Sequence, residues 1–209
     1  MSQVLLVRDL LPPLQPPMAR HPGVHVSTVI KYIAVQRGLL SADNSQLTST
    51  WSGLGQAHEY AVREMYARLH PGRYVTPGEM ELDGIYANLD LLDFDPLADD
   101  DLTDDARELL SDACPVPEEV KLADMGSLHT PRDCKPCDKP HCPRYWRYEA
   151  QVMSYCMYVG SPVGKLNVTH RMGDWKRDGA GPAHRLWVLR YTDDELANHW
   201  AMIVKHGDE

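Results

Sequence analysis

The sequence lacks any apolar run long enough to cross a membrane. It also lacks a convincing export signal, because the opening stretch MSQVLLVRDLLPPLQPP is interrupted by an acidic residue and by prolines. That stretch has neither a basic start nor a cleavage site of small residues, so we expect no signal peptide. From these absences we expect a cytoplasmic location and no association with a membrane.

Cysteine is scarce, and none of the five cysteines occurs before residue 114. An odd number gathered in one region does not suit a disulfide framework and favours a metal site. The compact, proline-rich spacing of three of them can clasp one ion, and a fourth lies upstream. The expected ligands are Cys114, Cys134, Cys137 and Cys142.

The sequence does not decide which metal these cysteines bind. Tetrahedral Zn²⁺ and a [4Fe–4S] cluster both suit four thiolates, and His129 and His141 are alternative ligands. The fifth cysteine, Cys156, lies within an expected helix and is predicted to belong to the core.

Positive charge is not in excess, since 21 basic residues face 30 acidic ones and the net charge is −9. Taken over the whole chain, this balance does not favour nucleic acid. The deficit is local, however, because residues 90–112 hold ten carboxylates and one arginine and so account for the whole of it. Residues 121–190 carry twelve basic residues against six acidic ones and can present a basic face.

The length of 209 residues and the 43% hydrophobic content suit one globular domain, and no internal repeat is present. Apolar spacing and capping residues predict helices at about 27–40, 55–69, 144–158 and after residue 192. Alternating patterns predict strands at about 79–86, 90–94, 117–123, 164–172 and 184–192. This order predicts an α/β fold with a mixed central sheet flanked by helices, an acidic insertion at about 95–113 and a cysteine-rich insertion at about 129–144.

Three residues on the predicted strands suggest an active site. Glu119 and Lys121 share one strand face because they are two residues apart, and we expect Asp83, in the motif ELDGIY, beside them on a neighbouring strand. Two carboxylates suit Mg²⁺ or Mn²⁺, and an adjacent lysine can orient a water or stabilise negative charge. These groups fit metal-assisted hydrolysis of a phosphodiester.

Two motifs on the flanking helices complete a pattern. His58 follows Gly55 in a Gly-x-x-His motif, and Gln151 and Tyr155 lie one helical turn apart. The order Gly-x-x-His, Asp-Gly-Ile, Glu-x-Lys, Gln-x-x-x-Tyr, over roughly residues 27–192, resembles the RecB-like branch of the PD-(D/E)XK nuclease superfamily. That branch includes CRISPR-associated RecB-like exonucleases and phage exonucleases.

The resemblance implies a restriction-endonuclease-like fold, with residues 1–209 as a single nuclease domain. It implies a metal-dependent DNA nuclease, and specifically an exonuclease, that serves DNA recombination, repair or phage DNA metabolism in a bacterium or a phage-infected cell. DNA ends, single- or double-stranded, are the implied substrate, and a recombination or single-strand-binding protein is a possible partner.

The resemblance also implies a role for each matched residue. The implied ligands of the catalytic Mg²⁺ or Mn²⁺ are His58, Asp83, Glu119 and the carbonyl group of Val120. Lys121 is implied to act on the attacking water. Gln151 and Tyr155 are implied to position the DNA backbone or to brace the site.

The pattern leaves two points open. The gap between Asp83 and Glu119 is long, and an alternative places Asp93 and Asp95 on the strand next to Asp83. In that alternative, Asp95 would stand at the position of the lysine, and the site would have no basic residue. We therefore prefer Glu119 with Lys121. The cysteines also do not follow the family's iron–sulfur spacing, in which one cysteine precedes the nuclease core and three follow it.

Two other functions fit the same residues. One is a catalytically inactive module that binds nucleic acid or protein, and the other is a metal hydrolase with a different substrate. The late basic segment favours DNA, since lysine and arginine meet phosphates and aromatic rings stack on unpaired bases. The candidate DNA contacts are Lys165, Arg171, Trp175, Lys176, Arg177, Arg185, Trp187 and Arg190.

Overall fold

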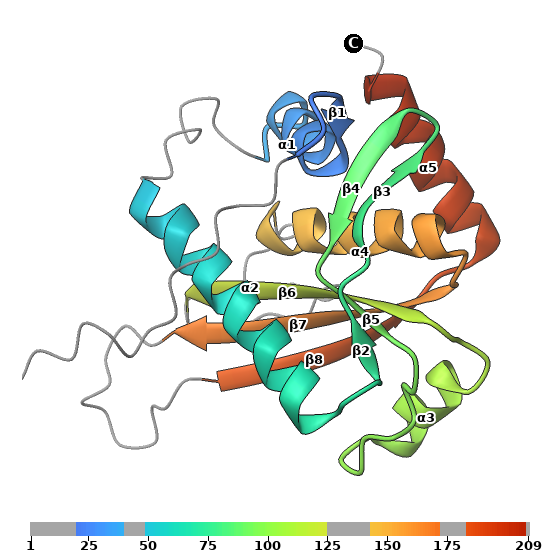
Figure 1. Ribbon diagram of the computed structural model, residues 1–209. Coiled ribbons are helices and arrows are strands. Elements are labelled where there is room, and N and C mark those ends of the chain that lie inside the picture. The colour runs from blue at the N-terminus through green and yellow to red at the C-terminus, as the bar shows by residue number, and fades with distance from the viewer. Residues whose placement is uncertain (1–19, 40–48, 125–142, 172–182, 208–209) are drawn as a thin grey trace, which may run out of the picture.

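The computed structural model describes residues 20–39, 49–124, 143–171 and 183–207 (Figure 1). The helices are α1 (Val26–Gln36), α2 (Ser49–Leu69), α3 (Asp104–Leu110), α4 (Pro143–Val159) and α5 (Asp193–Gly207). The strands are β1 (Val24–His25), β2 (Tyr74–Val75), β3 (Gly78–Leu82), β4 (Ile85–Leu89), β5 (Leu91–Asp93), β6 (Val116–Asp124), β7 (Val163–Arg171) and β8 (Ala183–Arg190).

The described strands form two separate small mixed sheets. One has the order β1-β4-β3, and the other has the order β2-β5-β6-β7-β8. The chain passes from the first sheet to the second between β4 and β5, at Asp90. In the larger sheet, β6 and β7 are parallel and α4 lies between them in the chain, as a parallel connection requires.

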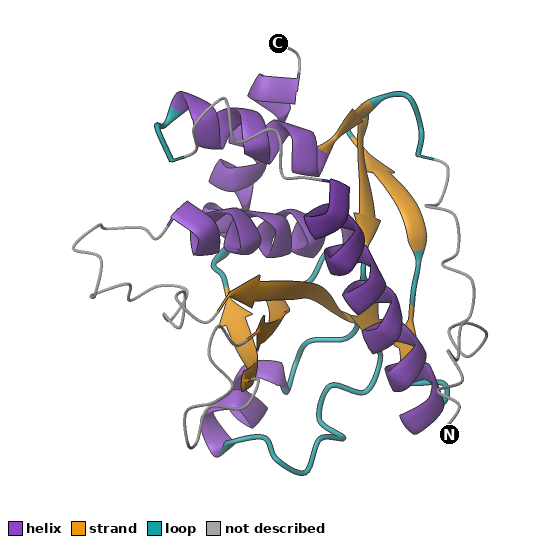
Figure 2. Cartoon of the chain, turned by 90° about the vertical axis from the view of Figure 1, so that its left-hand side faces the viewer, coloured by secondary structure: helices purple, strands orange, loops and turns teal. Residues whose placement is uncertain are grey.

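Helices cover both faces of the five-stranded sheet. On one face, Cys156 of α4 packs in a cluster with Leu166 of β7. On the other face, Val62 of α2 packs with Val120 of β6. Figure 2 turns the chain by 90° and shows the strands running between the helices. Both faces of this sheet are therefore covered near its centre, where Glu118, Glu119 and Lys165 are buried.

Local sequence explains where two of the helices begin and end. Thr192 and Glu195 form a reciprocal cap at the start of α5, in which each side chain accepts a hydrogen bond from the other residue's backbone N–H. Gly160 has a φ of 67°, which ends α4 at the residue before it. The predicted start of a helix after residue 192 and the predicted end of a helix at about residue 158 are both confirmed.

The predicted mixed α/β architecture is confirmed, and one predicted strand is wrong. The stretch expected as a single strand at 79–86 is a hairpin of β3 and β4 that turns at Asp83 and Gly84, both with positive φ. The acidic insertion contains α3 and lies between β5 and β6. The cysteine-rich insertion lies outside the described residues up to residue 142. None of the described helices combines the length and apolar character needed to span a bilayer.

Candidate active site

The strand β6 directs Glu119 and Lys121 of the Glu-Val-Lys motif to one face of the larger sheet. Glu119 is fully buried there, and the Lys121 ammonium makes an ion pair with its carboxylate. Glu118 points to the opposite face, where Oε1 accepts a hydrogen bond from Asn167 Nδ2 at 2.7 Å. Glu119, and not Glu118, is therefore the carboxylate of β6 that pairs with Lys121.

A second carboxylate comes from Asp90, at the junction of the two sheets. Because Leu91 pairs with Glu118 in the antiparallel ladder of β5 and β6, Asp90 comes alongside Glu119. Its Oδ2 accepts a hydrogen bond from the Val120 N–H at 2.9 Å and lies 3.9 Å from Lys121 Nζ. Asp90 is only 5% exposed, so its carboxylate is part of the interior.

A third carboxylate comes from α2. Glu59 Oε1 accepts a hydrogen bond from Lys121 Nζ at 3.2 Å. Glu59 of α2, Asp90 of the β4–β5 junction and Glu119 of β6 thus surround one ammonium group. Neither Glu59 nor Asp90 is in the set predicted from the sequence.

The predicted position of Asp83 is wrong. Asp83 lies in the β3–β4 turn, where its Oδ2 accepts a hydrogen bond from Trp200 Nε1 of α5 at 2.7 Å. The five residues of β4 separate this turn from Asp90, a distance of roughly 17 Å at about 3.3 Å per residue. Asp90 therefore occupies the place beside Glu119 that we expected for Asp83.

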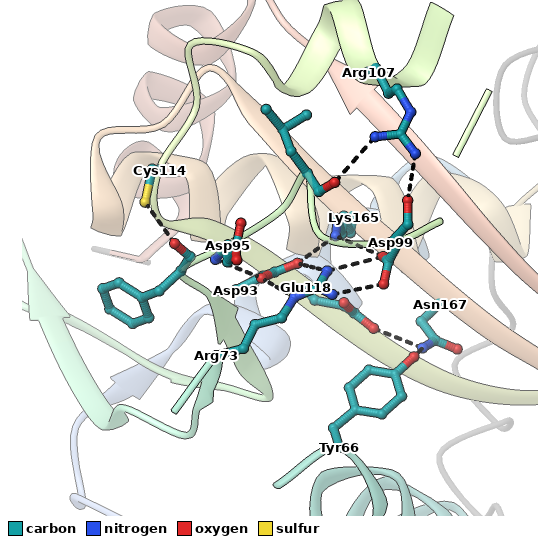
Figure 3. A network of polar contacts seen from close by, with 12 residues as sticks. Tyr66, Arg73, Asp93, Asp95, Asp99, Arg107, Cys114, Glu118, Lys165 and Asn167 are labelled. Carbon is teal, nitrogen blue, oxygen red and sulfur yellow. Dashed lines mark hydrogen bonds and ion pairs between the residues drawn. The ribbon is translucent and has the colours of Figure 1, made fainter. Parts of the chain in front are cut away.

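The alternative pair, Asp93 and Asp95, is not at this site either. Asp93 faces the other side of the sheet, where Lys165 Nζ approaches its Oδ2 to 2.6 Å and Arg73 donates two hydrogen bonds of 2.8 Å to it. Figure 3 shows this second cluster, in which Arg73 also reaches Asp99 of the acidic insertion. Asp95 lies just after β5, and its backbone N–H donates to Asp93.

The electrostatics of the site favour additional positive charge. Burial raises the pKa of Glu119 to about 8, against the opposing effect of Lys121 and with the support of Asp90 and Glu59. Burial also raises the pKa of Glu59. For Lys121, burial acts to lower the pKa, but the three carboxylates together hold it well above its ordinary value. The Lys121 ammonium therefore opposes, without cancelling, the effect of burial on the pKa values of Glu119 and Glu59.

The donor set suits a hard divalent cation. Both carboxylate oxygens of Glu119 are shielded from solvent, and Oε1 pairs with the Lys121 ammonium. Mg²⁺ and Mn²⁺ prefer such oxygens. No three acidic, histidine or cysteine side chains of the described residues are already spaced to hold a metal ion. Lys121 lies between the three carboxylates in this arrangement.

Two of the predicted flanking residues lie near this cluster. Among the described residues, the buried Nε2 atom of His58 has no hydrogen-bond partner. Burial, with His184 and Lys121, lowers the pKa of His58, which favours the neutral form that binds metals. Tyr155 is buried and donates a hydrogen bond to the Asn88 carbonyl at 3.1 Å. Burial and then Glu119 and Asp90 raise the pKa of Tyr155.

Two other predicted roles remain predictions. Gln151 is half-buried one helical turn before Tyr155 on α4. Val120 is fully buried, and its N–H donates to Asp90, whereas the metal-binding role of its carbonyl stays a prediction.

The predicted cysteine site falls mostly outside the described residues, which exclude Cys134, Cys137 and Cys142. Cys114 is exposed, and its thiol donates to the Phe94 carbonyl at 3.3 Å. The predicted place of Cys156 in the core is confirmed.

The prediction that Lys165 contacts DNA is wrong, because this residue is fully buried and paired with Asp93. Arg190 pairs with Asp112 of the acidic insertion at 2.8 Å. Arg185 is exposed, and Trp187 packs against a core cluster. The side chains of Arg171, Trp175, Lys176 and Arg177 lie outside the described residues.

No protein-family model matches the chain, and no curated protein is similar to it in sequence. Among solved structures, LHK-Exo in complex with dAMP is similar with a TM-score of 0.51 and 14% identity, over 88% of this chain and 85% of that one. A phage-related exonuclease from Haemophilus somnus 129PT gives 0.48 and 11%, over 90% and 92%. SSO0001 gives 0.46 and 13%, over 91% and 75%. The chain thus has the fold of an exonuclease, in keeping with its resemblance to the RecB-like branch of the PD-(D/E)XK nucleases.

Proposed function

We propose that the protein is a metal-dependent DNA nuclease, acting as an exonuclease in DNA recombination, repair or phage DNA metabolism. The observation that carries this proposal is the convergence of Glu59, Asp90 and Glu119 on the Lys121 ammonium. A fold shared with an exonuclease that was solved with dAMP supports DNA as the substrate. The basic segment near the end of the chain adds further support.

In this mechanism, the three carboxylates would hold Mg²⁺ or Mn²⁺, and the neutral imidazole of His58 would be available as a further ligand. When bound, the metal would polarise the scissile phosphate and lower the pKa of a water. Lys121 leaves the space between the carboxylates and donates a hydrogen bond to the attacking water or to the phosphate. Because the carboxylates hold its pKa high, Lys121 keeps its proton and acts as a hydrogen-bond donor and a positive charge, not as an acid or a base.

Tyr155 and Gln151 have supporting roles. The hydrogen bond from Tyr155 to the Asn88 carbonyl fixes the end of β4, two residues before Asp90, and so holds that carboxylate in place. Gln151 lies on the same face of α4 and is proposed to contact the DNA backbone.

We also propose that Cys114, Cys134, Cys137 and Cys142 hold a structural metal. Elemental analysis of the purified protein distinguishes zinc from iron, and visible absorption identifies an iron–sulfur cluster. A protein that contains neither metal contradicts this second proposal and leaves the nuclease proposal standing.

The nuclease proposal is tested by a matched pair of variants. Wild-type protein is expected to degrade linear DNA in the presence of Mn²⁺ or Mg²⁺. Asp90→Asn removes the carboxylate charge at the site and is expected to lower the rate at least about a hundredfold. Asp83→Asn makes the same chemical change in the β3–β4 turn and is expected to leave the rate within about twofold.

Two results contradict the proposal. Folded wild-type protein that binds DNA or a protein but cuts no DNA, single- or double-stranded, with either metal is a binding module. Asp83→Asn and Asp90→Asn proteins that lose activity equally place the chemistry elsewhere.

A further inference from the structure

Arg63 is a second cation at the site, and the mechanism above does not use it. It lies on α2, one helical turn after Glu59, and its Nη2 is 2.5 Å from Asp90 Oδ1. Both side chains are largely buried, with 22% of Arg63 and 7% of Asp90 exposed. The buried Nε atom of Arg63 has no hydrogen-bond partner in the part of the chain that the structure describes, and the contact with Asp90 is made through Nη2 at the end of the guanidinium.

The two oxygens of Asp90 have different partners. Oδ1 meets Arg63, whereas Oδ2 accepts a hydrogen bond from the Val120 N–H at 2.9 Å. These two contacts come from α2 and β6, and together they fix the plane of the carboxylate. Oδ2 is the oxygen that faces the Lys121 ammonium, at 3.9 Å. Only this oxygen is therefore directed to the point on which the three carboxylates converge.

We propose that Arg63 is a positioning residue that holds Oδ1 of Asp90 and so limits Asp90 to one metal-binding oxygen. This inference rests on the proposed function. An ion that accepts single carboxylate oxygens in an octahedral arrangement, as Mg²⁺ and Mn²⁺ do, suits such a site. Ca²⁺, which takes more oxygen ligands and often binds both oxygens of one carboxylate, is disfavoured at such a site.

If Arg63 acted only through its charge, it would weaken the binding of a metal ion, whereas the positioning role strengthens that binding. Arg63 is a positive charge close to the site, so its repulsion weakens the binding of any cation. If charge were its only effect, removing it would strengthen the binding of Mn²⁺ and Ca²⁺ alike. A lysine in its place would then leave the affinity unchanged. The positioning role predicts a loss with lysine, because a flexible ammonium keeps the charge without fixing the carboxylate.

The test is calorimetric titration of the full chain with Mn²⁺ and with Ca²⁺. Arg63→Lys is expected to weaken Mn²⁺ binding about tenfold, as is typical when a group that orients a metal ligand is lost. Arg63→Lys is also expected to reduce the ratio of the dissociation constant for Ca²⁺ to the dissociation constant for Mn²⁺. Arg63→Gln, which removes the charge, serves as a second variant. Arg68→Lys and Arg68→Gln are the controls, since Arg68 lies on the same helix with its side chain 80% exposed.

The outcomes separate this inference from the proposed function. Arg63→Lys protein that binds both ions like wild type, together with tighter binding by Arg63→Gln, reduces Arg63 to a charge effect and overturns the inference alone. Wild-type protein that binds no Mn²⁺ overturns the proposed function and the inference with it. Thermal unfolding of each variant checks that the fold is retained.

Discussion

Glu118 and Glu119 are neighbours in the chain with opposite surroundings. The alternation of the strand places Glu119 beside Lys121 and Glu118 beside Asn167 on the other face. Because helices cover both faces of the sheet, burial raises the pKa of Glu118 to about 7 and that of Glu119 to about 8. A metal can offset the cost of ionising Glu119. Glu118 has no such role in the mechanism, so its ionisation is a cost to stability.

We predict that Glu118→Gln stabilises the protein at alkaline pH. The amide oxygen still accepts a hydrogen bond from Asn167, and the variant removes a carboxyl group whose pKa is higher in the folded chain than the ordinary 4.5. Such a group contributes stability that is complete below pH 4.5 and is lost as the pH rises through about 7. The gain should therefore be small near pH 5 and reach about 3 kcal/mol at most above pH 7.

Urea unfolding at pH 5 and pH 8 measures this gain. Glu108→Gln, a change at an exposed site on α3, is the control and should show no gain that depends on pH. An equal effect of Glu118→Gln at both pH values contradicts the prediction.

At the scale of the element, the sequence pattern identifies the helices and the larger sheet well. The Glu-x-Lys strand and the helix that carries Tyr155 are found from alternation and from helical spacing. Their side chains come together because the helix connects two parallel strands and must pack on their sheet. The relation between Glu119 and Tyr155 is therefore local enough to follow from a single sequence.

The missed carboxylate has a physical explanation. Asp83 and Gly84 form the Asp-Gly pair typical of a two-residue hairpin turn, in which both residues have positive φ. The prediction of one strand over 79–86 overlooks this turn, and so it places Asp83 instead of Asp90 next to Glu119. The positions of Glu59 and Arg63 could not be predicted for another reason. Helical spacing shows the apolar face of α2, but only tertiary packing decides which polar residues at its border meet β6.

The contact between α4 and β7 leads to a second prediction. A methyl group added at Gly164 would lie 3.0 Å from Cys156 Sγ and closer still to Val152 Cγ1, so α4 would have to move away from the sheet. Gly164→Ala is expected to cost about 1–3 kcal/mol of stability. It should also lower nuclease activity, because α4 carries Tyr155.

Chemical unfolding and DNA degradation measure the two effects. Gly55→Ala in α2 is the matched control, since an added methyl group there meets open space and should stabilise the helix by roughly 0.5–1 kcal/mol. Unchanged stability of the Gly164→Ala protein would show that α4 is not held this closely.

At the scale of the whole molecule, two groups of carboxylates can attract a divalent cation. The larger group lies in the acidic insertion, which is tied to the domain by Arg73 bonding to Asp99 and by Arg190 bonding to Asp112. The smaller group consists of the buried carboxylates around Lys121. A divalent cation can be attracted by either location, but only the buried one offers several ligands fixed by separate elements. The two locations therefore make different predictions for metal binding.

We predict that Mn²⁺ stabilises the folded protein through the buried site. An ion that binds the folded chain adds about 2.7 kcal/mol at a hundredfold excess over its dissociation constant, which raises the unfolding temperature by roughly 5–10 °C for a chain of this size. Asp90→Asn and Glu119→Gln should abolish the shift. Asp101→Asn, at an exposed position of the acidic insertion, should retain it. Thermal unfolding with and without Mn²⁺ decides the matter, because a shift that persists in the Asp90→Asn protein assigns the binding to the acidic surface.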